Sequence, residues 1–93
     1  MNNIYEPDTY YLHKDGGLYF TLEQAKSTVD QADVVVYRHT FPFEPQVWVR
    51  PLVEWTADRF TKIPKFQAFD LLTKGDREKA KAEITAKRNA RKG

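Results

Sequence analysis

The chain has 93 residues, enough for one small domain, and no Cys, so neither a disulfide nor a thiolate metal site can supplement the core. No apolar run approaches the length that spans a bilayer, and the first residues lack the basic start and apolar centre of a secretion signal. We therefore expect a soluble, cytoplasmic protein. The net charge of +2 is uneven, because residues 74–93 hold eight Lys or Arg against three acidic residues, a balance of +5 that leaves −3 on residues 1–73.

The N-terminal part predicts a lead-in followed by a β-hairpin. Residues 1–8 are polar and suit a lead-in. A first strand starts near Thr9, and alternation places Tyr10 and Leu12 on the opposite side from Tyr11 and His13. The Asp-Gly-Gly sequence at residues 15–17 supplies the positive-φ positions of a tight turn into a second strand.

Residues 21–28 are compatible with two structures. Thr21 and Gln24 match a capping box, and residues 23–26 are good helix formers, which favours a short helix. Such a helix would end within about two turns, too short to be stable unsupported. We favour the alternative, a strand that continues from Tyr19 and turns within residues 27–33.

The central segment, residues 34–55, predicts a second hairpin. Two β-rich stretches, residues 34–39 and 47–55, flank the Pro-rich insert at residues 41–45. We expect residues 34–38 to pair antiparallel with residues 48–52.

Arg38 and Arg50 lie mid-strand among valines, where a charge needs an explanation. If the two arms pair so that both arginines share a face, they form with Trp48 a ledge suited to an anionic or planar partner. Alternatively, the arginines cover apolar neighbours and pair with local carboxylates such as Glu54 or Asp33.

Residues 56–72 complete the predicted β domain. Residues 56–60 resemble a single helical turn capped by Thr56, and residues 63–66 resemble a short edge strand with a proline at its boundary. We expect Phe60, Phe66 and Phe69 to close the open end of the core.

Residues 73–76 resemble a helix cap with an acidic first turn, and residues 77–91 have the composition of a helix. Its apolar stripe is thin, consisting of Ala80, Ile84 and scattered alanines. The helix should therefore be marginal alone or project from the body. The same face lacks the large apolar anchors of a membrane-surface helix, so we expect no membrane partner.

Four segments resemble a small bacterial and phage family, the domain-of-unknown-function family 1653. They read Tyr11-Leu-His-Lys-Asp-Gly-Gly-Leu-Tyr19, Val35-Val-Tyr-Arg38, Trp48-Val-Arg-Pro-Leu52 and Ile63-Pro-Lys-Phe66, and they lie within residues 9–66. The resemblance implies a compact, strongly bent sheet close to the small barrels of Src-homology-three type, with strand at residues 19–26, and a bacterial or phage origin. The chain departs from the family at its Pro-rich tip, at Glu23, where the family tends to glycine, and in its basic tail. The resemblance names no chemistry.

The predicted fold class is mainly β within α+β: a strongly bent antiparallel sheet or Src-homology-three-like barrel with a C-terminal α-helix. We divide the chain into a lead-in (1–8), a small β domain (9–72) and a basic C-terminal helix or tail (73–93). With two histidines, no Cys and no Gly-rich phosphate loop, a hydrolytic triad or strong zinc site lacks parts. We assign no catalytic residue, metal or cofactor, and we interpret His13 as a hydrogen-bonded strand histidine beside Tyr19.

The leading functional hypothesis is a non-enzymatic module that binds a phosphate-bearing partner, either nucleic acid or a nucleotide. The predicted ligand-binding residues combine guanidiniums with aromatic and imidazole rings: Arg38, Trp48, Arg50, Tyr37, His13 and Tyr19. The tail would add phosphate contacts through Lys87, Arg88, Arg91 and Lys92, unless it is only a solvated helix. The alternative hypothesis is a module that captures or inhibits a host protein, and the third is a small nucleotide-processing enzyme. The oligomeric state is left open.

Overall fold

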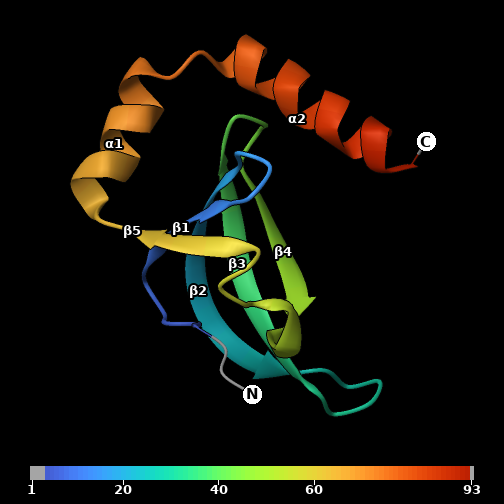
Figure 1. Ribbon diagram of the computed structural model, residues 1–93. Coiled ribbons are helices and arrows are strands. Elements are labelled where there is room, and N and C mark those ends of the chain that lie inside the picture. Colours follow the sequence, from blue (N-terminus) through green and yellow to red (C-terminus); the bar gives the residue numbers. More distant parts are fainter. Residues whose placement is uncertain (1–3, 93) are drawn as a thin grey trace.

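The computed structural model describes residues 4–92 (Figure 1). Its strands are β1 (Tyr10–His13), β2 (Leu18–Lys26), β3 (Asp33–Phe41), β4 (Gln46–Pro51) and β5 (Phe60–Ile63), and its helices are the short 3-10 helix η1 (Leu52–Glu54), α1 (Lys65–Lys74) and α2 (Arg77–Lys92). The strands form one antiparallel sheet in the order β4-β3-β2-β1-β5. Because β4 and β5 are its two edges, the sheet is open. The predicted α+β class, bent antiparallel sheet and C-terminal helix are confirmed, and the sheet does not close into a barrel.

The first hairpin forms where the sequence predicts it. Gly16 has a φ of +112°, a conformation that side chains with a Cβ rarely adopt, and the turn is closed by a 2.8 Å hydrogen bond from the Gly16 amide to the His13 carbonyl. After it, residues 18–26 are a strand, as we favoured over a helix. The register between β2 and β3 shifts between Thr21 and Glu23, a β-bulge that increases local bending, and Figure 1 shows β2 strongly curved.

The central hairpin is confirmed, with β3 and β4 paired from Val34 opposite Pro51 to His39 opposite Gln46. Directly opposed residues of an antiparallel pair share a face of the sheet. Arg50 is opposite Val35, whereas Arg38 is opposite Val47, and residues 35 and 38 point to different faces. The predicted ledge with both arginines on one face is therefore wrong.

The sheet buries apolar side chains on both of its faces. On one face, a cluster built around Trp55 packs under the lead-in and η1; its buried members are Tyr11, Tyr19, Val35, Tyr37, Trp55 and Phe60. The Trp55 and Phe60 rings are stacked with their centroids 3.8 Å apart. The lead-in described from residue 4 has no helix or strand, as expected, but it is fixed by hydrogen bonds such as that from the Tyr11 hydroxyl to the Ile4 carbonyl, 2.6 Å long. Residues 1–3 lie outside the described part of the chain.

The other face is covered by α1, which the sequence analysis missed. Residues 63–66 were expected to be an edge strand, but the edge strand is β5 and ends at Ile63, and Pro64 occupies the N-cap position of α1. Ala68 and Leu71, spaced by three, turn toward Leu18 and Phe41 on the sheet. The boundary that we drew at residue 72 falls inside this helix.

The three phenylalanines expected to close the core behave differently. Phe60 is buried, but the exposed fractions of Phe66 and Phe69 are 76% and 51%. The expectation is therefore wrong for these two residues, because α1 buries its Ala68 and Leu71 side instead. The expected single turn at Thr56 is present, with the Phe60 amide donating to the Thr56 carbonyl over 2.9 Å.

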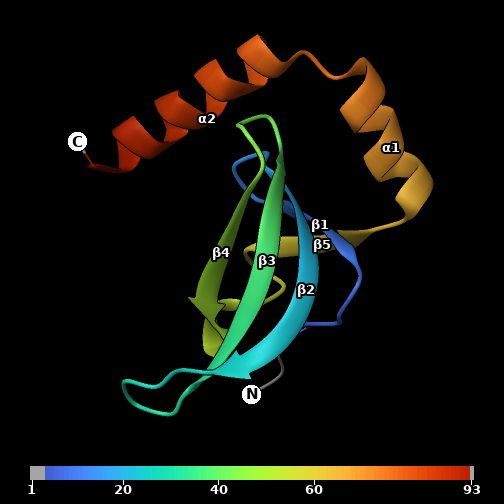
Figure 2. The same ribbon diagram turned by 180° about the vertical axis from the view of Figure 1, so that it is seen from behind.

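Helix α2 is docked and does not project from the body. It begins where predicted, with the Asp76 carboxylate accepting a 3.0 Å hydrogen bond from the Lys79 amide. Figures 1 and 2 show the helix passing across the ends of both hairpins. Ile84 is 1% exposed and lies against the Gly16 turn, while the Arg77 guanidinium donates to the Pro42 carbonyl over 3.1 Å. This position brings the basic face of α2 toward the sheet.

Candidate functional site

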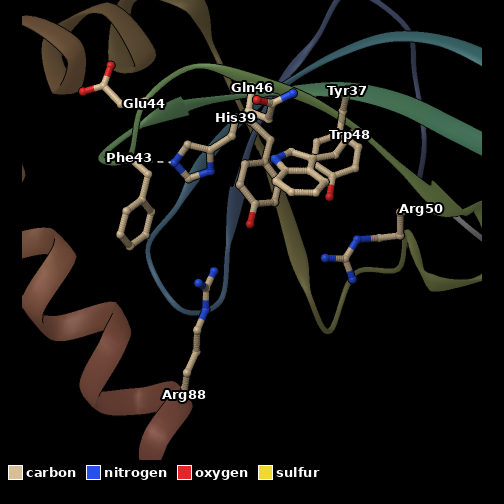
Figure 3. A pocket seen from close by; sticks show the side chains of 9 residues that line it. Tyr37, His39, Phe43, Glu44, Gln46, Trp48, Arg50 and Arg88 are labelled. Carbon is tan, nitrogen blue, oxygen red and sulfur yellow. Dashed lines mark hydrogen bonds between the residues drawn. The ribbon is translucent and has the colours of Figure 1, made fainter.

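Two adjoining cavities lie between the β3–β4 hairpin and α2, and together we call them the groove. The first, the aromatic cavity, has a volume of about 280 Å³ and is lined by Tyr19, Tyr37, His39, Phe43, Glu44, Gln46, Trp48, Arg50 and Arg88 (Figure 3). The second, the basic cavity, has a volume of about 500 Å³ and is lined by His13, Lys14, Asp15, Tyr19, Arg50, Arg59, Arg88 and Arg91. Tyr19, Arg50 and Arg88 line both cavities, so the two adjoin.

The wall of the aromatic cavity follows from strand alternation. Tyr37 and His39 are two residues apart on β3, and their partners across the hairpin, Trp48 and Gln46, point to the same face. The Tyr19 ring packs between them, with centroid distances of 5.1 Å to Tyr37 and 5.3 Å to His39. These three rings are nearly buried, but Trp48 is 56% exposed because β4 is an edge strand. Trp48 is thus an aromatic surface available to a ligand.

Arg50 combines the two roles that the sequence left open. One terminal nitrogen lies 3.2 Å from the Glu54 carboxylate, and the guanidinium carbon lies 5.5 Å from the Phe60 ring centroid and 6.0 Å from that of Tyr37. The side chain is only 23% exposed, and its Nε is buried without a hydrogen-bond partner among the residues that the structure describes. The ion pair and the ring contacts hold the guanidinium in place where it lines both cavities.

Arg88 faces Arg50 across the groove. Figure 3 shows Arg88 extending from α2 toward the rings of the sheet, while Arg50 enters from β4. The guanidinium of Arg88 lies 5.7 Å from the Phe43 ring centroid, and it forms no ion pair with the carboxylates that the structure describes. Two planar cations from different elements therefore border the same space.

Arg91 and Lys87 fasten α2 to the first hairpin. The two terminal nitrogens of Arg91 donate to the two carboxylate oxygens of Asp15 over 2.8 and 2.6 Å, and the Lys87 ammonium lies 3.5 Å from the Asp15 carbonyl oxygen. The hydrogen bond from Arg91 lowers the pKa of the Asp15 carboxyl to about 2. Arg91 therefore lines the basic cavity with its charge already paired with Asp15. Lys87 lines neither cavity.

The two histidines of the groove have lowered pKa values, chiefly because both rings are buried and secondly because cations surround them. Burial is the largest of the causes that lower the pKa of His13 to about 4. The charge of Asp15 opposes this shift, and the charges of Arg50, Lys14 and Arg88 add to it. Burial, followed by the charges of Arg88 and Arg77, lowers the pKa of His39 to about 4. Both rings are therefore neutral at pH 7. The His39 Nε2 accepts a 3.1 Å hydrogen bond from the Phe43 amide, and the expected packing of His13 beside Tyr19 is present at 5.8 Å between centroids.

The structure brings most of the predicted ligand-binding residues together. Tyr19, Tyr37, Trp48 and Arg50 line the aromatic cavity, and His13, Arg88 and Arg91 line the basic one. Arg38 is excluded from the groove, because it lies exposed on the opposite face of the sheet. Lys92 belongs to α2, but its side chain lies outside what the structure describes.

Sequence reasoning missed seven residues that line the groove: Lys14, Asp15, His39, Phe43, Glu44, Gln46 and Arg59. His39 could have been found, because it is two residues from Tyr37 on the same strand and must share its face. Lys14 and Arg59 lie in loops, and they meet because the Lys14 amide donates to the Arg59 carbonyl over 2.8 Å. No local pattern signals that contact.

Comparisons of the chain with protein-family models, curated proteins and solved structures found no significant match. Membership of the domain-of-unknown-function family named above therefore remains a prediction. Across residues 4–92, no helix is long and apolar enough to cross a membrane. Within that same range, no three His, Asp or Glu side chains gather as potential metal ligands.

Proposed function

We propose that the protein is a binding module for a phosphate-bearing partner and that the groove is its binding site. The observation that carries the proposal is the pair of guanidiniums, Arg50 from β4 and Arg88 from α2, that line both adjoining cavities of the groove. Guanidiniums bind phosphate oxygens with two parallel hydrogen bonds, and they bind most strongly where water is partly excluded. The exposed Trp48 in the same groove supplies a face on which a base can stack.

The revised site replaces the ledge that we first expected. Arg38 does not belong to this site. From the tail, Arg88 is the residue that contacts the ligand directly. Arg91 and Lys87 instead hold α2 on the first hairpin. The tail is then a structural wall of the site and not a separate, free phosphate-binding arm. Helix α2 nevertheless adds positive charge to the site, because its Arg88 guanidinium lines the groove.

Titration of the purified protein with nucleotides and with short single-stranded DNA and RNA tests the proposal. Arg88→Gln should weaken binding of the phosphate-bearing ligand at least tenfold and flatten its salt dependence. Lys79→Gln is the matched control, because it removes the same charge from an exposed position of α2 that lines neither cavity. Equal losses in the two variants, or no binding by any phosphate-bearing ligand, would contradict the proposal.

A protein-interaction module is the second candidate, and the open edge of the sheet favours it. The outer face of the edge strand β4 exposes Val47 and Val49, with exposed fractions of 44% and 63%. An exposed edge strand with apolar side chains can pair with a strand of another chain. A pull-down from bacterial lysate in which Val49→Lys loses a partner that the wild type retains would support this candidate.

A further inference from the structure

We infer that the groove binds a nucleoside di- or triphosphate, with the base in the aromatic cavity and the phosphate chain in the basic cavity. The inference rests on the proposed function and names the ligand class for the same site. It depends on how charge and aromatic surface are divided between the two cavities.

The positive charge is concentrated at one end of the groove. Lys14, Arg50, Arg59, Arg88 and Arg91 all line the basic cavity. The carboxylates in contact with them are Asp15, which pairs with Arg91, and Glu54, which lies 3.2 Å from Arg50 and 3.5 Å from Arg59. Five cations against these two carboxylates and the nearby Asp58, which interacts electrostatically with Arg59 and Lys14, leave a net positive charge in a space of about 500 Å³.

Such a concentration of charge matches a phosphate chain better than a nucleic-acid strand. A strand has about one negative charge per nucleotide, so its binding sites distribute cations along a track. A diphosphate or triphosphate chain instead carries about three or more negative charges within one short segment, because its terminal phosphate alone contributes up to about two. This excess of positive charge in a single cavity is complementary to that segment.

The aromatic cavity has the complementary features of a base site. Its wall consists of Tyr37, His39 and the exposed Trp48, and the two histidines of the groove are neutral at pH 7. Gln46 provides an amide that can both donate and accept at a base edge. Arg50 lies between the two cavities, where it would meet the first phosphate of a nucleotide whose base contacts Trp48.

Calorimetric titration in buffer without divalent cations tests the inference. The ligands are the four ribonucleoside triphosphates, their monophosphates, inorganic triphosphate and a 12-nucleotide single strand. We expect at least one triphosphate to bind ten or more times more tightly than its monophosphate and than inorganic triphosphate. Because base stacking on an aromatic ring changes affinity by roughly 5- to 150-fold, Trp48→Ala should weaken binding of that nucleotide by this factor and leave inorganic triphosphate unaffected.

The variants separate the two cavities. Arg88→Gln should weaken both the nucleotide and inorganic triphosphate, and Arg38→Gln, on the opposite face, should weaken neither. Binding of the single strand without binding of any triphosphate would overturn the inference and leave the proposed function standing. Equal affinity for inorganic triphosphate and the nucleotides would also overturn it, since the base would then contribute nothing. If no phosphate-bearing ligand binds, the proposed function itself is wrong.

Discussion

Arg38 and Arg50, the two arginines of the central hairpin, lie on opposite faces of the sheet. They differ in environment as well as in direction: Arg50 is packed over the Phe60 ring and paired with Glu54, whereas Arg38 is exposed and has no ion pair among residues 4–92. The chain therefore contains its own control for any experiment on the groove.

We predict that Arg50→Lys lowers both stability and ligand affinity. Lysine keeps the charge but lacks the planar group that packs on Phe60 and contacts Glu54 at the same time. Because the ion pair is partly exposed, we expect the unfolding free energy to fall by only about 1 kcal/mol. Thermal melting and ligand titration measure the two effects. Arg38→Lys should change neither, and a loss of the same size in that variant would show that the response is not specific to the groove.

Docking of α2 depends on Ile84. We expect Ile84→Ala to lower the unfolding free energy by about 2 kcal/mol, the low end for deletion of a buried Ile side chain, because a terminal helix can shift to reduce the cavity. Hydrogen exchange should show the amides of α2 losing protection before those of β2 and β3. Thr85→Ala changes an exposed neighbour on the same helix and should leave the protection of α2 unaltered. Uniform loss of protection across sheet and helix would contradict the separate docking of α2.

The ion pair between Asp15 and Arg91 makes the docking of α2 dependent on pH. The folded-state pKa of Asp15 is lowered from its ordinary value of 3.8 to about 2, so its contribution to stability is complete above about pH 4 and is lost as the pH falls toward 2. Asp15→Asn should remove this contribution. Denaturation curves of wild type and variant are expected to differ at pH 6 and to converge near pH 2. A constant difference over that range would rule out the titration of Asp15 as its source.

The two histidines shift the balance of protons in the same direction as Asp15, but at higher pH. Their folded-state pKa values of about 4 lie below the ordinary 6.5, so the unfolded chain binds more protons between these values and stability falls as the pH drops through that window. NMR titration of the imidazole protons measures both pKa values directly. A bound polyphosphate adds negative charge beside both rings, and we expect it to raise the pKa of His13 and His39. In the Arg88→Gln variant, both values should rise even without a ligand, because a cation that lowers them is gone.

The sequence predicted the parts of the fold that local patterns determine. The Asp-Gly-Gly turn, the alternation within β1 and β3, and the cap at Asp76 each depend on a few neighbouring residues, and each is found as expected. Helix α1 was missed because its apolar stripe is short and Pro64, read as a strand boundary, is instead the residue before the helix. Local composition cannot distinguish these two uses of a proline.

The site was predicted only in part, because its geometry depends on pairing between distant segments. The strands that contain Arg38 and Arg50 were identified correctly, but their register decides which arginine shares a face with Trp48. Arg88 reaches the groove because long-range contacts, above all the buried Ile84 and the Asp15–Arg91 pair, place α2 across the hairpins. Neither contact has a signal in the composition of the tail.

The Asp15–Arg91 contact joins residues 76 positions apart, and this separation has a consequence for the order of folding. Contacts between residues close in sequence form with little loss of chain entropy, whereas a contact that closes most of the chain forms efficiently only after the segments between are compact. We therefore expect the hairpins and the sheet to form first and α2 to dock last. On a ribosome, the residues of the sheet are also synthesised before those of α2. The aromatic wall of the groove is therefore synthesised before Arg88, which borders the groove from α2.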